Sequence, residues 1–390
     1  MNNFKFYAPT EVVFGKDVEN ETGEVARKYG KKAFLVYGKG SVVKSGLLER
    51  VEKSLTEAGL EYEEFGGAKP NPTVAHAREG VSKALSFGAD LIIAVGGGSA
   101  IDTAKAIAHG AANSDSDVWD IWTKKVPLEK SLPVGAVLTI PAAGSEMSDS
   151  AVLTNEEIGK KAGINTDFNR CRFAIMNPAL ASTLPKNQVA AGVTDIMMHT
   201  MERYFIPGIK CDMTDEIAEG LLRTVIKNGA KVVKDPSDFD SMSEVFWASS
   251  LSHNNLTECG RGKDFSVHKL GHALSAKYDV THGASLSAVW GSWAKELYKE
   301  AVSRFARYAR NVWKVTEVDD EKAALAGIEK TVEFFKSIEM PVSLTGLGIS
   351  PSDEDLHALA LDATMNDSMK LSRIRPLDAE AVYKIYKAAL

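Results

Sequence analysis

One carboxylate and several imidazoles recur at helical spacing in the second half of the sequence. Asp195 and His199 are four residues apart, as are His268 and His272, and His282 follows ten residues later. Residues four apart lie on one face of a helix, so each pair can direct two side chains at one point. Fe²⁺ and Zn²⁺ both accept carboxylate oxygen and imidazole nitrogen, so the pattern predicts a site for one divalent metal.

The same residues have a less specific interpretation. An aspartate and a histidine four apart occur by chance, and a single histidine is more often a surface or core residue than a ligand. Four of the eight histidines, however, lie between residues 253 and 282, and this clustering favours a site. The protease motif HExxH is excluded, because Lys269 follows His268 where a glutamate is required.

Two glycine-rich turns in the first half could hold a nucleotide. The first, Gly96-Gly97-Gly98-Ser99, lies between an apolar run and a helical stretch. Glycines let a phosphate approach the backbone, and the start of a helix offers free N–H groups. We expect Ser99 to cap that helix, with Asp102 as its partner. The spacing is not GxGxxG, because Ile101 replaces the third glycine, so a turn without a ligand is the alternative.

The second turn, Gly38-Lys39-Gly40-Ser41, follows the apolar run Lys32–Tyr37. By itself it fits a plain turn as well as a nucleotide site. Sites selective for NAD(H) place a carboxylate near the adenine ribose, whereas NADP(H) sites need a cation or open space for the extra phosphate. This turn carries Lys39, has Lys44 nearby and contains no acid, which favours NADP(H) over NAD(H).

The elements that must position these residues differ between the two halves. Up to about residue 186, short apolar runs alternate with glycine turns and helical stretches, which is typical of βαβ units with a parallel sheet. Beyond residue 186, the apolar residues of nearly every segment recur with the period of a helix. The sequence predicts a Rossmann-like α/β dinucleotide-binding domain over residues 1–186 and an all-helical metal-binding domain over residues 187–390. Residues 4–14 could form a hairpin or an edge strand, and residues 284–313 a single helix.

Composition narrows the class of protein. The chain has 390 residues, of which 44% are hydrophobic and 25% charged, as in ordinary globular proteins. Its net charge of −6 argues against a nucleic-acid partner. Three scattered cysteines without CxxC indicate neither a zinc knuckle nor a disulfide framework, and they fit a reducing compartment. We find neither a signal peptide nor a long apolar run, so we expect a cytoplasmic protein with no membrane contact.

Seven segments together resemble the iron-containing (group III) alcohol dehydrogenases, and most closely their butanol dehydrogenase-like branch. They follow the family's order and cover nearly the whole chain: PNPT (70–73), GGGSAIDTAK (96–105), TIPAAGSE (139–146), GKKAGI (159–164), NPALASTLP (177–185), AAGVTDIMMHTMERY (190–204) and HKLGHALSAKYDVTHG (268–283). Each segment alone is weak evidence, whereas the set in this order is specific.

The resemblance implies roles for individual residues. His272 would not bind the metal but would lie beside nicotinamide and substrate as a proton relay. Lys161 would add positive charge near the ribose–nicotinamide end, although a solvated surface lysine is the alternative. The implied metal ligands are Asp195, His199, His268 and His282. The implied cofactor-binding positions, beside Lys39, are Gly38, Ser41, Asn71, Gly97, Gly98, Ser99, Asp102, Thr139, Lys161 and Leu180.

The resemblance also implies the activity and the assembly. The expected enzyme is a metal-dependent alcohol dehydrogenase or aldehyde reductase that transfers hydride between NADP(H) and small primary alcohols or aldehydes such as butanol and butanal. A homodimer would form through residues 4–14. Two positions depart from the family's pattern: Ala143 replaces a common threonine, and Asn177 a common aspartate.

Two other functions remain open. One is a relative with the same two-domain plan, either a glycerol dehydrogenase-like polyol enzyme or a dehydroquinate synthase-like enzyme. The other is a metal- and nucleotide-binding protein that has lost catalysis. The complete ligand set and the intact glycine turn favour the dehydrogenase.

Overall fold

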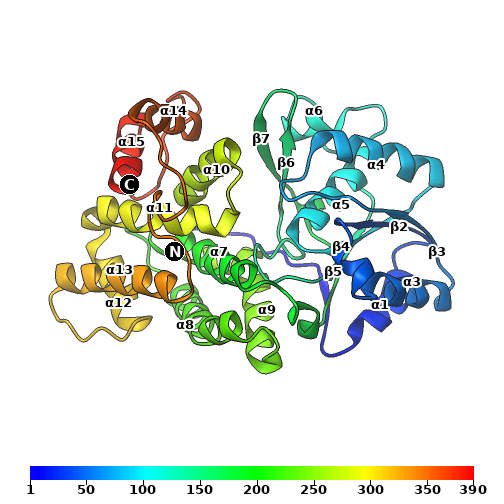
Figure 1. The fold of residues 1–390 in the computed structure, drawn as a ribbon, viewed down its shortest axis with the longest axis horizontal. Helices are drawn as coiled ribbons and strands as arrows, with labels where there is room; N and C mark the ends of the chain where they lie inside the picture. Colours follow the sequence, from blue (N-terminus) through cyan, green and yellow to red (C-terminus); the bar gives the residue numbers. More distant parts are fainter. The chain divides into compact units, whose positions relative to one another are not determined.

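The computed structural model describes residues 1–390, which divide into two compact units. One unit comprises residues 7–182, and the other comprises residues 1–6 together with residues 183–390. The first is a parallel sheet flanked by helices, and the second is built of helices (Figure 1). The predicted class, an α/β part followed by an all-α part, is confirmed.

The sheet of the first unit has six parallel strands in the order β1-β8-β5-β4-β2-β3. The strands are β1 (Glu11–Phe14), β2 (Lys32–Tyr37), β3 (Glu61–Phe65), β4 (Leu91–Gly96), β5 (Val134–Leu138) and β8 (Phe173–Met176). Strands β4 and β5 are buried along their whole length, which explains their uninterrupted apolar sequences. The register pairs Tyr37 with Val95 and Gly96 with Leu138, so the carboxyl ends of β2, β4 and β5 meet at one edge.

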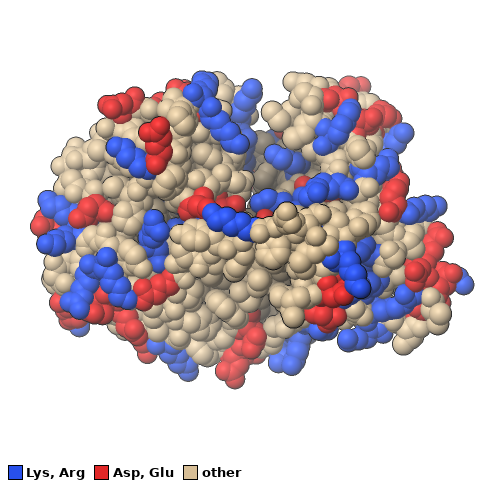
Figure 2. All heavy atoms as spheres, turned by 180° about the vertical axis from the view of Figure 1, so that it is seen from behind, with Lys and Arg blue, Asp and Glu red and all other residues tan.

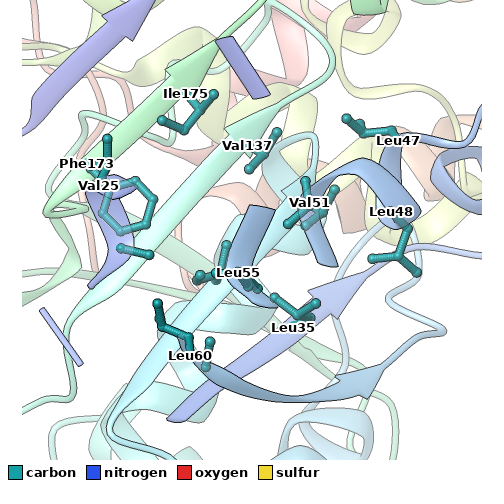
Figure 3. Packing of buried hydrophobic residues seen from close by; sticks show 14 of the residues in the cluster. Val25, Leu35, Leu47, Leu48, Val51, Leu55, Leu60, Val137, Phe173 and Ile175 are labelled. Carbon is teal, nitrogen blue, oxygen red and sulfur yellow. The ribbon is translucent and has the colours of Figure 1, made fainter. Parts of the chain in front are cut away.

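Helices pack against this sheet through apolar side chains. They are α1 (Thr22–Ala26), α2 (Ser41–Lys44), α3 (Leu47–Glu57), α4 (Val74–Phe87), α5 (Gly98–Ala112) and α6 (Val118–Trp122). In one core cluster Val51 and Leu55 of α3 pack with Leu35 of β2 and Phe173 of β8 (Figure 3). Gly135 makes room for that ring, because a Cβ there would lie 2.0 Å from Phe173 Cζ.

A two-stranded antiparallel hairpin, β6 (Ser150–Asn155) and β7 (Lys160–Asn165), completes the first unit. The N-terminal segment forms only β1, a parallel edge strand beside β8, so the hairpin alternative for residues 4–14 is wrong and the edge strand is confirmed for residues 11–14. Residues 1–10 have no regular structure, and Phe4 and Phe6 are exposed.

The second unit contains the helices α7 (Lys186–Tyr204), α8 (Asp212–Lys234), α9 (Phe239–His253), α10 (Ser266–Tyr278), α11 (His282–Leu297), α12 (Val302–Asn311), α13 (Asp320–Ser337), α14 (Asp353–Ala363) and α15 (Ala379–Ala388). The single helix predicted over residues 284–313 is wrong. The short 3-10 helix Tyr298–Ala301 separates α11 from α12, because Ala301 leaves the helical region at φ −139° and ψ 35°. None of the helices is long and apolar enough to cross a bilayer.

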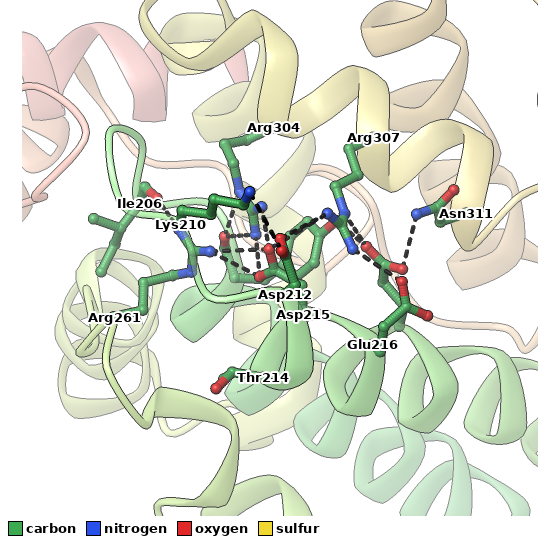
Figure 4. Close-up of polar contacts among 12 residues, drawn as sticks. Ile206, Lys210, Asp212, Thr214, Asp215, Glu216, Arg261, Arg304, Arg307 and Asn311 are labelled. Carbon is green, nitrogen blue, oxygen red and sulfur yellow. Dashed lines mark hydrogen bonds and ion pairs between the residues drawn. The ribbon is translucent and has the colours of Figure 1, made fainter. Parts of the chain in front are cut away.

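A buried ion-pair network joins α8 to α12 in this unit (Figure 4). The Asp215 carboxylate accepts hydrogen bonds from Arg261 at 2.8 Å and from Arg304 at 2.7 Å. Arg304 also donates to the carbonyl oxygen of Tyr204, at the end of α7. Because breaking a buried pair leaves an uncompensated charge, this network fixes how α7, α8 and α12 pack. On the surface, basic and acidic side chains are interspersed over the face drawn in Figure 2.

Candidate functional site

Helix α7 carries two of the predicted metal ligands on one face. Every residue from Val189 to Tyr204 is buried, so polar side chains there need partners inside the protein. Asp195 and His199 lie one turn apart, each only 3% exposed. The Oδ1 atom of Asp195 lies 3.5 Å from Nε2 of His199.

The other two predicted ligands come from α10 and α11, which pack against each other and against α7. His268 is the third residue of α10, and its Nε2 lies 3.5 Å from the same Asp195 Oδ1. His282 begins α11, and its Nε2 lies 3.6 Å from that oxygen. The structure thus brings all four predicted ligands together, with three imidazole nitrogens around one carboxylate oxygen.

These distances fit a cation better than hydrogen bonds. Ligands about 2.1 Å from a tetrahedral metal lie about 3.4 Å from one another. Separations of 3.5–3.6 Å match that value and are too long for good hydrogen bonds. Asp195 Oδ1 and His268 Nε2 are buried and make no hydrogen bond. Leaving two such atoms unsatisfied is unfavourable, and a cation between them would satisfy both.

The electrostatics of the cluster also suit a cation. Burial, with the neighbouring His253 and His268, holds the pKa of His199 well below its ordinary value. Its imidazole is therefore neutral, which is the form that binds metals. Burial would also lower the pKa of His268, but the carboxylates of Glu202 and Asp195 raise it to about 9. The same two carboxylates therefore favour positive charge at this ring, either as a proton or as a bound metal ion.

Three further side chains surround the ligands and were not singled out from the sequence. His253, the last residue of α9, stacks on His199 with ring centroids 3.9 Å apart. Phe265 presents its ring edge-on to His268 at 5.0 Å and has a left-handed backbone with φ 60°. The guanidinium of Arg203 lies 4.7 Å over the Phe265 ring and donates to the carbonyl oxygen of His199. Only His253, as a member of the histidine cluster, had a signal in the sequence.

The proposed relay residue, His272, lies one helical turn beyond His268 on α10. Its ring centroid is 5.2 Å from that of His282 and 6.1 Å from that of His268. The side chain is partly exposed, unlike that of His268. His272 therefore lies beside the ligand cluster.

In the first unit, both glycine turns lie at the switch point of the sheet. Neighbouring strands β2 and β4 continue in opposite directions, β2 to β3 and β4 to β5. Ligands of open α/β sheets bind at such a point, beyond the carboxyl ends of the strands. Gly38 follows β2, Gly97 follows β4, and Thr139 follows β5 and donates its N–H to Gly96 at 3.1 Å. A Cβ on Gly97 would lie 2.2 Å from Ile140 Cγ2, so only glycine fits.

The expected capping role of Ser99 is wrong. Helix α5 begins at Gly98, one residue before Ser99, and its N-cap is Gly97, which has no side chain to cap with. Asp102 does not act in a cap but accepts hydrogen bonds from two other segments. Its carboxylate accepts from Ser145 Oγ at 2.7 Å and from the backbone N–H of Val152 at 3.0 Å. Asp102 therefore joins α5 to the loop after β5 and to β6, and burial raises its pKa.

Other predicted cofactor residues lie around these turns. Lys161 on β7 donates to Asn71 Oδ1 at 3.0 Å, although the two are far apart in the sequence. Lys39 and Ser41 are exposed. Leu180 packs against the core cluster of Figure 3. A residue missed from the sequence is Lys105 on α5, which is fully buried and donates to Ser145 and Ser150 at the base of the same loops.

Known families and proteins match the whole chain. Residues 9–178 match the model of the iron-containing alcohol dehydrogenases, and residues 189–390 that of the C-terminal part of the same family. NADH-dependent butanol dehydrogenase A of Clostridium acetobutylicum is 36% identical, over 99% of both chains. NADPH-dependent aldehyde reductase YqhD of Escherichia coli is 32% identical, over 100% of both. The crystal structure of NADH-dependent butanol dehydrogenase A from Thermotoga maritima superposes with a TM-score of 0.95 at 34% identity, covering 100% of this chain and 99% of that one.

Proposed function

The chain belongs to the iron-containing alcohol dehydrogenase family, and on that premise we propose a metal-dependent alcohol dehydrogenase and aldehyde reductase that uses NADP(H). Its substrates are small primary alcohols and aldehydes such as butanol and butanal. The observation that carries the proposal is the convergence of three imidazole Nε2 atoms within 3.5–3.6 Å of Asp195 Oδ1.

The proposed metal ligands are Asp195, His199, His268 and His282. When bound, a divalent cation supplies Lewis acidity toward the substrate oxygen, and the nicotinamide supplies or accepts the hydride. With a divalent cation bound, one carboxylate among neutral imidazoles would leave the site with a net charge of about +1, because the carboxylate offsets only half of the ion's charge. The all-N/O ligand set suits Fe²⁺ and Zn²⁺ equally.

Reduction of an aldehyde also requires a proton at the substrate oxygen. We assign its delivery to His272, because an imidazole can act as a general acid or base and this one lies beside the ligand cluster. The same side chain would accept the proton when an alcohol is oxidised.

The cofactor is assigned to the two glycine turns at the switch point, together with Lys161 of β7 and its hydrogen-bond partner Asn71. The relatives named above include both an NADH-dependent and an NADPH-dependent enzyme, so the choice must rest on this chain's own residues. Lys39 and Lys44 place positive charge at the turn after β2, which contains no acid. This supports NADP(H), whose extra phosphate needs a cation. The exposed Phe4 and Phe6 of the N-terminal segment support a homodimer, which the mass in solution would test.

The test compares two reactions, each monitored through the absorbance of NADPH. One is the reduction of butanal with NADPH, and the other is the oxidation of glycerol with NADP⁺. We expect fast reduction of butanal and slow oxidation of glycerol. The reverse preference would identify a polyol enzyme, and a protein that binds Zn²⁺ and NADPH without turnover would have lost catalysis.

A further inference from the structure

The carboxylate of Glu202 contacts the His268 ring on the side opposite the metal-facing nitrogen. Its Oε2 is hydrogen-bonded to His268 Nδ1, while Nε2 of the same ring lies 3.5 Å from Asp195 Oδ1. Glu202 is 1% exposed, so its interactions are not weakened by solvent. The ring is therefore held between two carboxylates, one at each nitrogen.

The second oxygen of Glu202 binds the start of α10. Oε1 accepts from the backbone N–H of Val267 at 2.6 Å and from that of His268 at 3.2 Å. These N–H groups belong to the first turn of α10, where they have no partner within the helix. A negative charge is favourable there, so Glu202 also fixes the end of the helix that carries His268.

We infer that Glu202 is a positioning residue of the metal centre, which directs the Nε2 lone pair of His268 toward the cation. This inference rests on the proposed metal-dependent function. A neutral imidazole carries one proton, and a carboxylate that accepts from Nδ1 holds that proton on Nδ1 and leaves Nε2 free to bind metal. The hydrogen bond also increases the basicity of the ligating nitrogen.

The position of Glu202 on α7 supports this role. Asp195, His199 and Glu202 occupy positions i, i+4 and i+7, which share one face of a helix. The same face of α7 thus supplies two ligands directly and orients a third from α10. The spacing D-x-x-x-H-x-x-E is visible in the sequence at residues 195–202.

Replacement of Glu202 by glutamine tests the inference, because an amide has only one acceptor oxygen. If that oxygen faces Val267 and His268 N–H, the NH₂ group faces Nδ1 and favours the proton on Nε2, where it blocks the metal. If the amide is reversed, the N–H groups of α10 lose their acceptor. The matched control is Glu258→Gln, which removes a nearby carboxylate that pairs with Arg203 at 3.0 Å and touches no proposed ligand.

The first measurement is the affinity of the metal-free proteins for Zn²⁺, in competition with a chromophoric chelator. We expect affinity about 10–100-fold weaker for Glu202→Gln and unchanged for Glu258→Gln. Equal affinity of wild type and Glu202→Gln would overturn the inference alone. Failure of the wild type to bind one Zn²⁺ per chain would overturn the proposed function, and the inference with it.

The second measurement separates orientation of the ring from mere anchoring of α10. The Zn²⁺-loaded wild type should show a downfield imidazole N–H proton from the Nδ1–Oε2 hydrogen bond, assigned by its loss in His268→Gln. It should move upfield in Glu202→Gln and stay in place in Glu258→Gln. Should Glu202→Gln fail to fold, the wild-type spectrum decides, because absence of that proton would overturn the inference.

Discussion

Asn177 donates from Nδ2 to Oε2 of Glu19 at 2.8 Å, and both side chains are 2% exposed. Both ends of the amide are engaged, since its Oδ1 accepts from the N–H of Ala179 at the start of the 3-10 helix Pro178–Ala181. Glu19 in turn accepts from Arg50 at 3.1 Å. An aspartate at position 177 would place a second carboxylate against Glu19. The asparagine in this chain is therefore matched to its buried partner.

Replacement of Asn177 by aspartate should destabilise the protein. The change removes a hydrogen-bond donor and buries two carboxylates together, so we expect the free energy of unfolding to fall by about 1–3 kcal/mol near neutral pH. The loss should shrink as pH falls, because protonation of either carboxyl restores a donor. Urea denaturation at pH 8 and pH 5 measures both effects. Adding Glu19→Gln should restore stability in part, and a single variant as stable as wild type at pH 8 would contradict the argument.

Removal of the metal should abolish turnover. A chelator should inactivate the enzyme toward butanal, and added Fe²⁺ or Zn²⁺ should restore activity, because a bound cation would supply the Lewis acidity that the proposed reaction needs. The metal should also raise the melting temperature of the apoprotein, since it binds only the folded state. Asp195→Asn keeps the shape of the side chain but removes its negative charge. In this variant, added metal should neither restore activity nor raise the melting temperature. Full activity in a metal-free preparation would contradict the proposed function.

Lys39→Asp should change the choice of cofactor. The carboxylate would repel the extra phosphate of NADPH and could accept from a ribose hydroxyl of NADH. We expect the dissociation constant for NADPH to rise about tenfold or more, with a smaller change for NADH. Lys384→Asp on α15, an exposed lysine in the other unit, makes the same change in net charge and serves as the control. If the affinities for NADPH and NADH fall equally, Lys39 does not contact the extra phosphate.

His109, buried in α5, should make the protein sensitive to acid. Its Nε2 donates to Asn169 Oδ1 at 2.8 Å, because the amide of Asn169 already donates to Asp149 and Ile164. Burial lowers the pKa of His109 to about 4, against 6.5 ordinarily. Between those pH values the unfolded chain binds a proton that the native state does not, so stability falls as pH falls through that window.

The size of this effect can be isolated by mutation. The shift corresponds to about 3 kcal/mol, present in full above pH 6.5 and lost by about pH 4. His109→Gln cannot titrate, so its denaturation midpoint should fall less than that of wild type between pH 7 and pH 5. Acid sensitivity from other groups is common to both proteins. Parallel pH curves would show that His109 is not held neutral.

Much of the fold could be predicted from the sequence, because the spacing of apolar residues indicates which face of each helix or strand is buried. Strand β2 coincides with the apolar run Lys32–Tyr37 that the sequence shows. Strand β3 was missed because three of its five residues are glutamates, which an edge strand can direct to solvent. The hairpin β6–β7 was missed because the sequence of β7, KKAGIN, is polar and half exposed.

The site was less predictable than the fold, because its supporting contacts join distant segments. Helical spacing places Asp195, His199 and Glu202 on one face of a helix, but it does not indicate that Glu202 contacts the His268 ring on a different helix. The predicted N-cap at Ser99 was wrong because α5 begins at Gly98, with Gly97 as its N-cap. Contacts such as Lys161 with Asn71 depend on how loops from different strands meet, which one sequence does not reveal.

His272→Asn should separate proton transfer from metal binding. If His272 delivers the proton to the substrate oxygen and does not hold the cation, the variant should keep its metal while kcat for butanal reduction falls about 10²-fold. Added imidazole should restore part of the rate, because the lost side chain is partly exposed. Metal content and kcat measured on the same samples make the distinction, with replacement of the exposed His357 of α14 by asparagine as the control. If the variant loses both its metal and its activity, His272 is a metal ligand. If kcat is unchanged, His272 does not deliver the proton, and water does so instead.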